Sequence, residues 1–253
     1  GTAGTQNFTL TVNEAPSVTS PNTVTFLVGT SGTFSFTGAG FPAPTFSLSG
    51  TLPSGVTFNS GNGSISGTPN AGAGGVYNLT VTASNGVGSA ATQAFALTVN
   101  EAASVTPATS STTFTATVSG TSTTPPTTGG YPTAFNWTTA SNLPAGLSLD
   151  ANTGVISGTA GVGTGGVYTV VLNVSNGVGA AATHTLTLTV NERTAITSGL
   201  QATFTAGTPG SFQVTATGYP SNNFVYSVAT GTLPMGVSLN SSTGELAGTP
   251  QTG

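Results

Sequence analysis

The sequence contains no cysteine and almost no charge. Of its 253 residues, one is basic and five are acidic, so only 2% of the chain is charged and the formal net charge is −4. The absence of cysteine excludes disulfide bonds and thiolate metal sites. The single basic residue, Arg193, cannot neutralise several phosphates, so the composition argues against a nucleic-acid-binding protein.

Long apolar runs and helical periodicity are also missing. No stretch approaches the roughly 20 apolar residues that a membrane-spanning helix requires, so no membrane span is predicted in this segment. Apolar residues instead alternate with polar ones. In "HTLTLTV", Leu186, Leu188 and Val190 share one face and threonines occupy the other. Such alternation, rich in β-branched and aromatic residues, is typical of strands with one buried face and favours an ordered chain over a disordered one.

Three repeats follow one another along the chain. The triplet "VNE" ends at Glu14, Glu101 and Glu192, with spacings of 87 and 91 residues. A complete repeat contains about seven short strands with turn signals every 8 to 12 residues, which is typical of an immunoglobulin-like β-sandwich. The predicted fold class is therefore all-β, with tandem sandwiches. No Gly- or Pro-rich spacer separates Val99 from Ser104, so the sandwiches are predicted to form an extended rod.

The two ends of the chain differ from the complete repeats. Near the N-terminus, "NFTLTVNE" matches the last strand of a repeat, and the C-terminal repeat is predicted to lack its last two strands. Either the residues are a window of a longer chain, which is the favoured interpretation, or the first strand of one copy completes the last domain of the next and builds a fibre. The second interpretation is weaker because one strand cannot replace two. The predicted units are residues 1–13 (last strand of a preceding unit), 14–100, 101–191 and 192–253 (incomplete).

Each repeat contains one glycine-rich hairpin motif. It reads "LPSGVTFNSGNGSISGTP" in the first repeat, "LPAGLSLDANTGVISGTA" in the second and "LPMGVSLNSSTGELAGTP" in the third. Glycine accepts the positive φ that such turns require, so the repeated glycines are interpreted as turn residues. The hairpin glycines are Gly63, Gly154 and Gly244, and a second set follows at Gly67, Gly158 and Gly248.

Two further features of the repeats predict local structure. A Gly-aromatic-Pro corner, at Gly40, Gly130 and Gly218, is followed by an aromatic strand position in each repeat. These aromatic residues, Phe46, Trp137 and Tyr226, are predicted to anchor the cores. The Ser/Thr/Pro cluster from Thr117 to Gly130 is predicted to be a flexible loop, with O-glycan attachment as the alternative.

The motif LP-x-G-(L/V)-(S/T)-(L/F)-x(4)-G-x-(I/L)-x-G-T resembles that of the bacterial immunoglobulin-like tandem repeat domains, relatives of cadherin-like modules in large secreted and surface proteins. The resemblance covers two whole repeats and most of a third. It implies a sandwich fold, an extracellular or cell-surface location, and a spacer, adhesive or interaction role. It implies no shared catalytic residues. Relatives often carry more acidic residues in the hairpin turn, where this chain has only Asp150.

Catalytic residues are not predicted. The junction glutamates are each about one domain length apart, and no G-x-S-x-G elbow is present. His184, near the start of a strand, has no evident acidic partner and is interpreted as a strand-end residue. Calcium needs six to eight oxygen ligands, and one carboxylate per junction is few, so no cofactor is predicted and stability should depend little on calcium. The weak calcium candidates are Glu14, Glu101, Asp150 and Glu192.

The predicted function is structural: a non-catalytic repeat segment of an extracellular fibre, stalk or adhesin shaft. Its expected partners are neighbouring immunoglobulin-like repeats of the same longer chain, and a self-assembled homopolymer in a filament is considered as well. Two alternatives remain open on sequence alone. One is a carbohydrate- or protein-binding module that uses loops at the sandwich ends, and the other is a set of accessory domains in a giant secreted enzyme.

Overall fold

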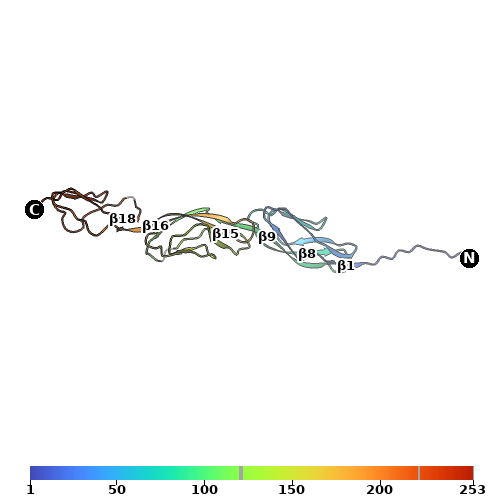
Figure 1. Ribbon diagram of the computed structural model, residues 1–253. Coiled ribbons are helices and arrows are strands. Elements are labelled where there is room, and N and C mark those ends of the chain that lie inside the picture. Colours follow the sequence, from blue (N-terminus) through green and yellow to red (C-terminus); the bar gives the residue numbers. More distant parts are fainter. Residues whose placement is uncertain (120–121, 222, 253) are drawn as a thin grey trace. The chain divides into compact units, whose positions relative to one another are not determined.

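The computed structural model describes residues 1–119, 122–221 and 223–252, which form twenty β-strands and no helix (Figure 1). The predicted all-β class is therefore confirmed. The described chain divides into two compact units. The first comprises Gly1–Val105, Thr128–Phe135 and Val174–Ala182, and the second comprises the remaining residues. The sequence positions 100/101 and 191/192, where one repeat was predicted to pass into the next, lie inside these units.

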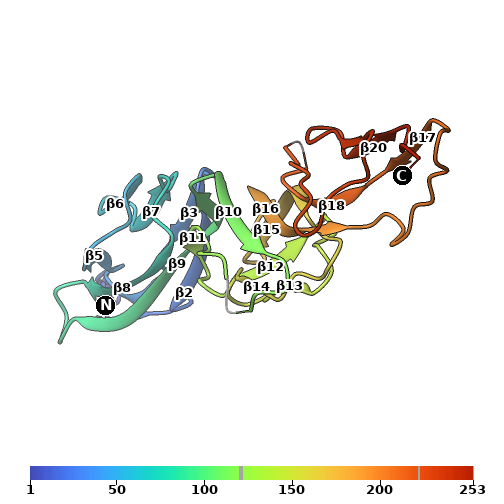
Figure 2. The same cartoon turned by 90° about the vertical axis from the view of Figure 1, so that its left-hand side faces the viewer.

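The first unit contains a sandwich of two sheets (Figure 2). Its strands are β1 (Glu14–Val18), β2 (Thr23–Leu27), β3 (Gly32–Ser35), β4 (Gly38–Phe41), β5 (Thr45–Ser49), β6 (Val56–Asn59), β7 (Ser64–Gly67), β8 (Gly75–Ser84), β9 (Ala91–Thr106) and β11 (Thr127–Tyr131). One sheet has the order β11-β9-β8-β5, with β2 parallel to β9, and the other has the order β3-β7-β6. Strands β1 and β4 form a separate antiparallel pair.

Alternating side chains of both sheets fill the core of this sandwich. Leu97 and Val99 of β9 are fully buried, and so is Ile65 of the opposite sheet. The ring of Phe36 lies 4.9 Å from that of Phe95 and meets it edge-on, the arrangement that aromatic pairs prefer. The apolar half of each strand is thus removed from water, which is the main source of stability for a fold of this size.

The second unit contains strands of the second and the third repeat. Its strands are β10 (Thr109–Thr115), β12 (Asn136–Thr139), β13 (Leu147–Leu149), β14 (Ile156–Gly158), β15 (Gly166–Ser175), β16 (Ala182–Ile196), β17 (Gly210–Gln213), β18 (Ala216–Tyr219), β19 (Val237–Leu239) and β20 (Glu245–Gly248). The sheet β10-β16-β15-β12 corresponds to β2-β9-β8-β5, and β10 runs parallel to β16. Leu186, Leu188 and Val190 are buried on one face of β16, as their alternation predicted.

The prediction of a flexible loop over residues 117–130 is wrong in part. Residues 120 and 121 lie outside the described chain, but Thr123 makes two contacts with β14: its amide donates to the carbonyl of Ile156, and its hydroxyl accepts from the Ile156 amide, each at 2.9 Å. From Thr127 onward the segment is strand β11. The Thr123 hydroxyl accepts a hydrogen bond that a backbone carbonyl would accept in a regular sheet. The composition of the segment does not reveal this contact.

The aromatic anchors are confirmed most clearly in the second repeat. Trp137 is only 3% exposed, whereas Phe46 and Tyr226 are half-buried. Each of the three rings packs on the hairpin glycine of its own repeat, and a Cβ built on that glycine would lie 2.6 to 2.8 Å from the ring. The φ values of Gly63, Gly154 and Gly244 are 63°, 72° and 75°, so the predicted positive φ is also confirmed.

The second set of glycines has a different role from the predicted one. Gly67, Gly158 and Gly248 lie at the ends of strands and not in turns. Their φ values are positive, and two backbones approach each other closely at each of them. A Cβ on Gly158 would lie 2.2 Å from the carbonyl oxygen of Gly146, and the same clash recurs in the other two repeats. The "LP-x-G" glycine and the "G-T" glycine therefore face each other across a hairpin.

Two segments of the last repeat lack the strands of their counterparts. Residues 201–205 correspond to β2, which pairs only with β9, and residues 223–229 correspond to β5, which pairs with β8. Among the described residues 193–252, no strand corresponds to β8 or β9. Both segments are therefore without a partner strand and are irregular, although their sequence pattern is that of a strand.

Candidate functional site at the repeat junctions

Two strands pass directly from one repeat into the next. Strand β9 contains the last strand of the first repeat, then Asn100 and Glu101, then the first strand of the second repeat. Strand β16 does the same around Asn191 and Glu192. Each junction lies within one compact unit.

The carboxylate of Glu101 binds the loop that precedes β8. The amide of Gly72 donates to Glu101 Oε1 at 2.7 Å, and the amide of Gly74 donates to Oε2 at 3.0 Å. A Cβ on Gly74 would lie 2.8 Å from the Cβ of Glu101 and 2.9 Å from the Cβ of Tyr131. Gly74 thus lies wedged between a glutamate and an aromatic residue, and only glycine fits there without displacing them.

The same arrangement recurs at the second junction. The amides of Gly163 and Gly165 donate to the two carboxylate oxygens of Glu192, the latter at 3.0 Å. Gly165 in turn lies between the Cβ atoms of Glu192 and Tyr219. We call this unit, a carboxylate that holds two glycine amides beside an aromatic residue, the clasp. Hydrogen bonds to a charged acceptor are stronger than neutral ones, so the clasp fixes the glycine loop on the next repeat.

Tyrosines hold each glycine loop from inside its own repeat. The hydroxyl of Tyr77 donates to the carbonyl of Ala73 at 3.0 Å, and that of Tyr168 donates to the carbonyl of Thr164 at 2.7 Å. Each loop is therefore fixed on both sides, by a tyrosine from its own repeat and by a glutamate from the following one.

An asparagine holds the receiving side of the clasp at Glu101 in place. The side-chain amide of Asn176 donates to the carbonyl of Glu101 at 2.8 Å and to that of Pro132 at 3.0 Å. It therefore ties the start of the repeat's first strand to the Gly-aromatic-Pro corner. Asn85 makes the equivalent bonds in the first repeat, to Glu14 and Pro42. Each corner contains a cis peptide bond before its proline.

The clasp is the functional feature that the sequence interpretation missed. The sequence indicated the glutamates only as weak calcium candidates, whereas Glu101 and Glu192 accept hydrogen bonds from backbone amides. One signal was present: in both junctions the bonded glycines precede the glutamate by 29 and 27 residues. Equal spacing of Gly-x-Gly-Gly before the second and the third "VNE" triplet indicates a repeated contact.

The structure does not bring the four calcium candidates together. Glu101 and Glu192 hold glycine loops, Asp150 lies in a hairpin turn, and Glu14 is exposed at the start of β1. Within residues 1–119, 122–221 and 223–252, no three His, Asp or Glu side chains are grouped in a way that suits a metal ion.

Asp150 has a structural role in its turn. The amides of Asn152 and Thr153 donate to its Oδ1 at 2.8 and 3.0 Å. These backbone hydrogen bonds favour the charged form and lower the pKa of Asp150 below its ordinary value of 3.8. Asn240 accepts the equivalent pair of amides in the third repeat, so an uncharged side chain makes the same turn.

The turn at Asp150 predicts a pH-dependent contribution to stability. Because the pKa is lowered in the folded state, the charged side chain stabilises the fold above pH 3.8, and this contribution disappears as the pH falls through the folded-state pKa. We expect the difference in melting temperature between the wild type and Asp150→Asn to shrink between pH 7 and pH 2. Contributions that are common to both proteins cancel in the difference. A difference that stays constant over this range would contradict the prediction.

His184 is a buried structural residue and not simply a strand end. It is 1% exposed; its Nδ1 lies 2.9 Å from the carbonyl oxygen of Pro107 and its Nε2 lies 2.7 Å from the hydroxyl of Ser110. Ser110, His184 and the Pro107 carbonyl thus form a row of three hydrogen-bonded groups. A catalytic triad has a carboxylate where this row has a carbonyl, so the three groups do not form such a triad. Gln93 occupies the equivalent position in the first repeat and bonds the equivalent carbonyl, that of Ser20. The ring therefore ties two strands together.

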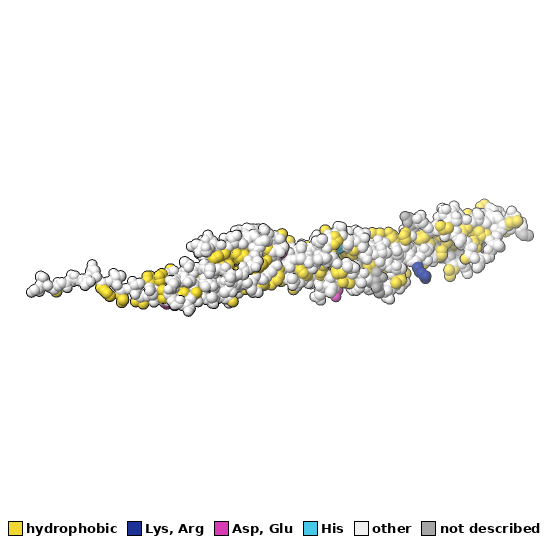
Figure 3. Space-filling model, turned by 180° about the vertical axis from the view of Figure 1, so that it is seen from behind, with side chains coloured by type: hydrophobic (Ala, Val, Ile, Leu, Met, Phe, Trp, Pro, Cys, Tyr) yellow, Lys and Arg dark blue, Asp and Glu magenta, His cyan; other side chains and the backbone are white. Residues whose placement is uncertain are grey.

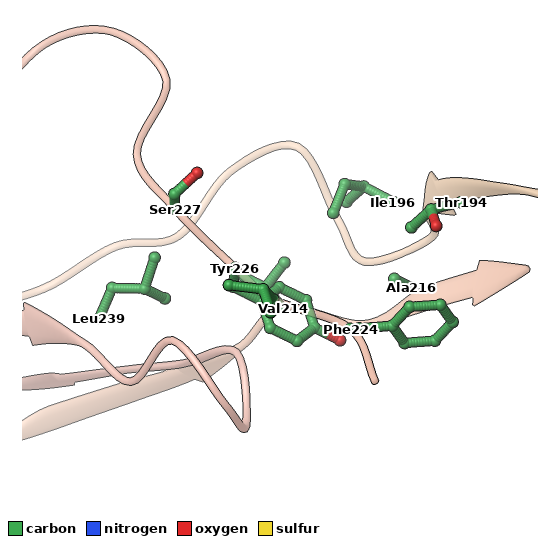
Figure 4. A pocket seen from close by; sticks show the side chains of 9 residues that line it. Thr194, Ile196, Val214, Ala216, Phe224, Tyr226, Ser227 and Leu239 are labelled. Atoms are coloured by element: carbon green, nitrogen blue, oxygen red, sulfur yellow. The ribbon is translucent and has the colours of Figure 1, made fainter. Parts of the chain in front are cut away.

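The surface carries little charge, and the second unit contains an apolar pocket. Figure 3 shows a face of mixed apolar and uncharged polar side chains with very little charge. An apolar pocket in the second unit is lined by Ile196, Val214, Phe224, Tyr226 and Leu239 among others (Figure 4). It lies beside the irregular segment 223–229. The described residues include no helix long and apolar enough to span a bilayer.

Comparison with known proteins agrees with this architecture. The family model described as "Putative Ig domain" matches three successive stretches, residues 15–100, 99–191 and 193–253. Among solved structures, the I-band fragment I67-I69 from titin is 14% identical, with a TM-score of 0.56 over 94% of this chain and 89% of that one. A Glu-to-Ala variant of the same titin fragment has a TM-score of 0.55 at 14% identity and equal coverage. No curated protein matches the chain. At this identity the structures show the fold alone.

Proposed function

The chain belongs to the Putative Ig domain family, and we propose that it is a non-catalytic structural segment that carries mechanical load in an extracellular fibre, stalk or adhesin shaft. Tandem immunoglobulin-like domains serve as structural repeats or as binding modules. The observation that supports the structural role is the clasp, which is present at both junctions with the same atoms.

The junction geometry suits the transmission of tension. A strand that runs through a junction leaves no linker that could lengthen under force, because its residues are already extended. The clasp adds a second connection, from the glycine loop of one repeat to the first strand of the next. Separation of two repeats therefore requires the rupture of two charge-assisted hydrogen bonds, in addition to the strain on the chain itself.

Four ionisable side chains that could in principle take part in acid–base chemistry are engaged in structural contacts. Glu101 and Glu192 bind amides, Asp150 holds a turn, and His184 links two strands. This supports a non-catalytic role. The extracellular or cell-surface location rests on the sequence resemblance to tandem repeats of secreted and surface proteins.

Stretching single molecules from their two ends tests the mechanical role. The first and second repeats are 87 and 91 residues long, measured from one junction glutamate to the next. Each is expected to unfold in one event that lengthens the chain by roughly 30 nm, since an extended chain spans about 3.3 to 3.6 Å per residue. The molecule should lengthen little before the first unfolding event, because the residues at the junctions are already extended. A gradual lengthening at low force, without discrete events, would contradict a load-carrying role.

A further inference from the structure

The first repeat carries an unfilled copy of the receiving side of the clasp. We propose that Glu14 and Phe41 form a docking site for the glycine loop of another immunoglobulin-like repeat, one whose last strand leads directly into Glu14. This inference rests on the proposed role as a tandem structural segment and specifies the partner of one particular surface. We call the pairing of a junction glutamate with the aromatic residue of its corner the cradle.

Strand register places Glu14 and Phe41 as the residues of a filled cradle are placed. In the pair β1–β4, Glu14 lies opposite Phe41, and the register then shifts before Ser17. In the pair β16–β18, Glu192 lies opposite Tyr219, and the register shifts at the same point, before Ala195. The backbone of the empty cradle therefore has the pairing and the irregularity that hold Gly165 at the filled one.

Exposure separates the empty cradle from the filled ones. Phe41 is 53% exposed and Glu14 is exposed, whereas Glu101, Glu192 and their partner tyrosines are half-buried beneath the glycine loops. An aromatic ring exposed to this extent beside a carboxylate matches the composition of the filled sites. It lacks only the loop that would cover it.

The empty cradle is already held in its receiving geometry. Asn85 donates to the carbonyls of Glu14 and Pro42, both at 2.8 Å. Asn176 makes the same two bonds at the filled cradle of Glu101. Because the strand and the corner are fixed before any loop arrives, docking does not require their reorganisation.

The chemistry of the filled cradles identifies the occupant. Both hold the sequence Gly-x-Gly-Gly, at residues 72–75 and 163–166, whose amides reach the carboxylate and whose missing side chains allow close approach. In both cases the loop belongs to the repeat whose last strand runs into the glutamate.

The segment before Glu14 has the pattern of such a last strand. Its apolar positions are exposed, Phe8 at 84%, Leu10 at 75% and Val12 at 72%. The corresponding positions of β9 are Phe95, Leu97 and Val99, which are buried in their sandwich. A repeat that takes residues 6–13 as its last strand would bury these side chains and bring its own glycine loop to Glu14.

A chain with one added repeat tests the proposal. A second copy of residues 14–100 is inserted between Asn13 and Glu14, so that residues 1–253 are all retained and every strand keeps its neighbours. Hydrogen exchange is then measured at the amides of Gly72 and Gly74 in the inserted copy. We expect Glu14→Ala, made at the residue that follows the inserted copy, to accelerate exchange at these two amides by about 10-fold, since loss of a charge-assisted bond opens the loop locally.

Two controls keep the result interpretable. Glu101→Ala should accelerate exchange in the glycine loop next to it and not at the inserted junction, and Glu245→Ala, which lies outside every junction, should accelerate neither. Glu14→Gln keeps the shape of the side chain and serves if the alanine variant folds poorly; a smaller acceleration at the same amides is expected. Unchanged exchange at Gly72 and Gly74 of the inserted copy in both Glu14 variants would overturn the proposal. The stretching experiment reports on load, so its failure is distinguishable from this one.

Discussion

Replacing Trp137 by alanine is expected to lower the free energy of unfolding of the middle repeat by about 3 to 5 kcal/mol. The side chain is 3% exposed, and its ring covers Gly154: a Cβ added to that glycine would lie 2.6 to 3.0 Å from Cε2, Cδ2 and Nε1 of the indole. Truncation removes the largest side chain of this core and leaves a cavity that rigid strands on both sides cannot close. The loss therefore combines transfer of the ring to water with the empty volume.

Circular dichroism or calorimetry measures the loss, because the substitution removes the only tryptophan and with it the natural fluorescence probe. Val162→Ala is a matched control in the same repeat: this side chain is 81% exposed, and a change within about 0.5 kcal/mol is expected. A Trp137→Ala variant with unchanged stability that had lost binding to a sugar or a receptor would instead support a binding module.

Replacing Gly158 by alanine is expected to cost about 3 to 4 kcal/mol, although it adds a single methyl group. The φ of Gly158 is 133°, a conformation that L side chains rarely adopt, and the new Cβ would lie 2.2 Å from the carbonyl oxygen of Gly146. Strain of the backbone contributes about 1 to 2 kcal/mol. The new methyl group must also displace the carbonyl oxygen of Gly146, which cannot rotate away as a side chain can. This displacement costs about 1 to 3 kcal/mol more.

Gly177→Ala separates these two contributions. Gly177 has a φ of 80°, but no atom lies within 4 Å of its built Cβ, so only the backbone strain applies there. Chemical denaturation of both variants should therefore show the Gly158 variant to be less stable than the Gly177 variant by at least about 1 kcal/mol. Equal losses would show that the two strands of the hairpin separate readily and that the close approach is not a constraint.

The sequence by itself determined the class and the repetition of the fold. Alternation in segments such as Leu186–Val190 requires one buried face, whatever the partner, because a strand's side chains point alternately to opposite sides. The positive φ at Gly154 was predictable for the same kind of reason, since a short polar turn between two strands has few conformations. The burial of Trp137 followed from its position within an alternating strand.

Only the tertiary structure decided what the repeated glycines and glutamates contact. Gly158 resembles a turn residue in the sequence, yet the reason for it is an oxygen twelve residues earlier across a hairpin. Glu101 and Gly74 are 27 residues apart and meet because β8 and β9 are neighbours in a sheet, a pairing that local patterns do not specify. His184 was misjudged for the same reason, since its partner Pro107 is 77 residues away. Local alternation determines which face of a strand is buried, whereas contacts between distant residues depend on how the strands are arranged in the sheet.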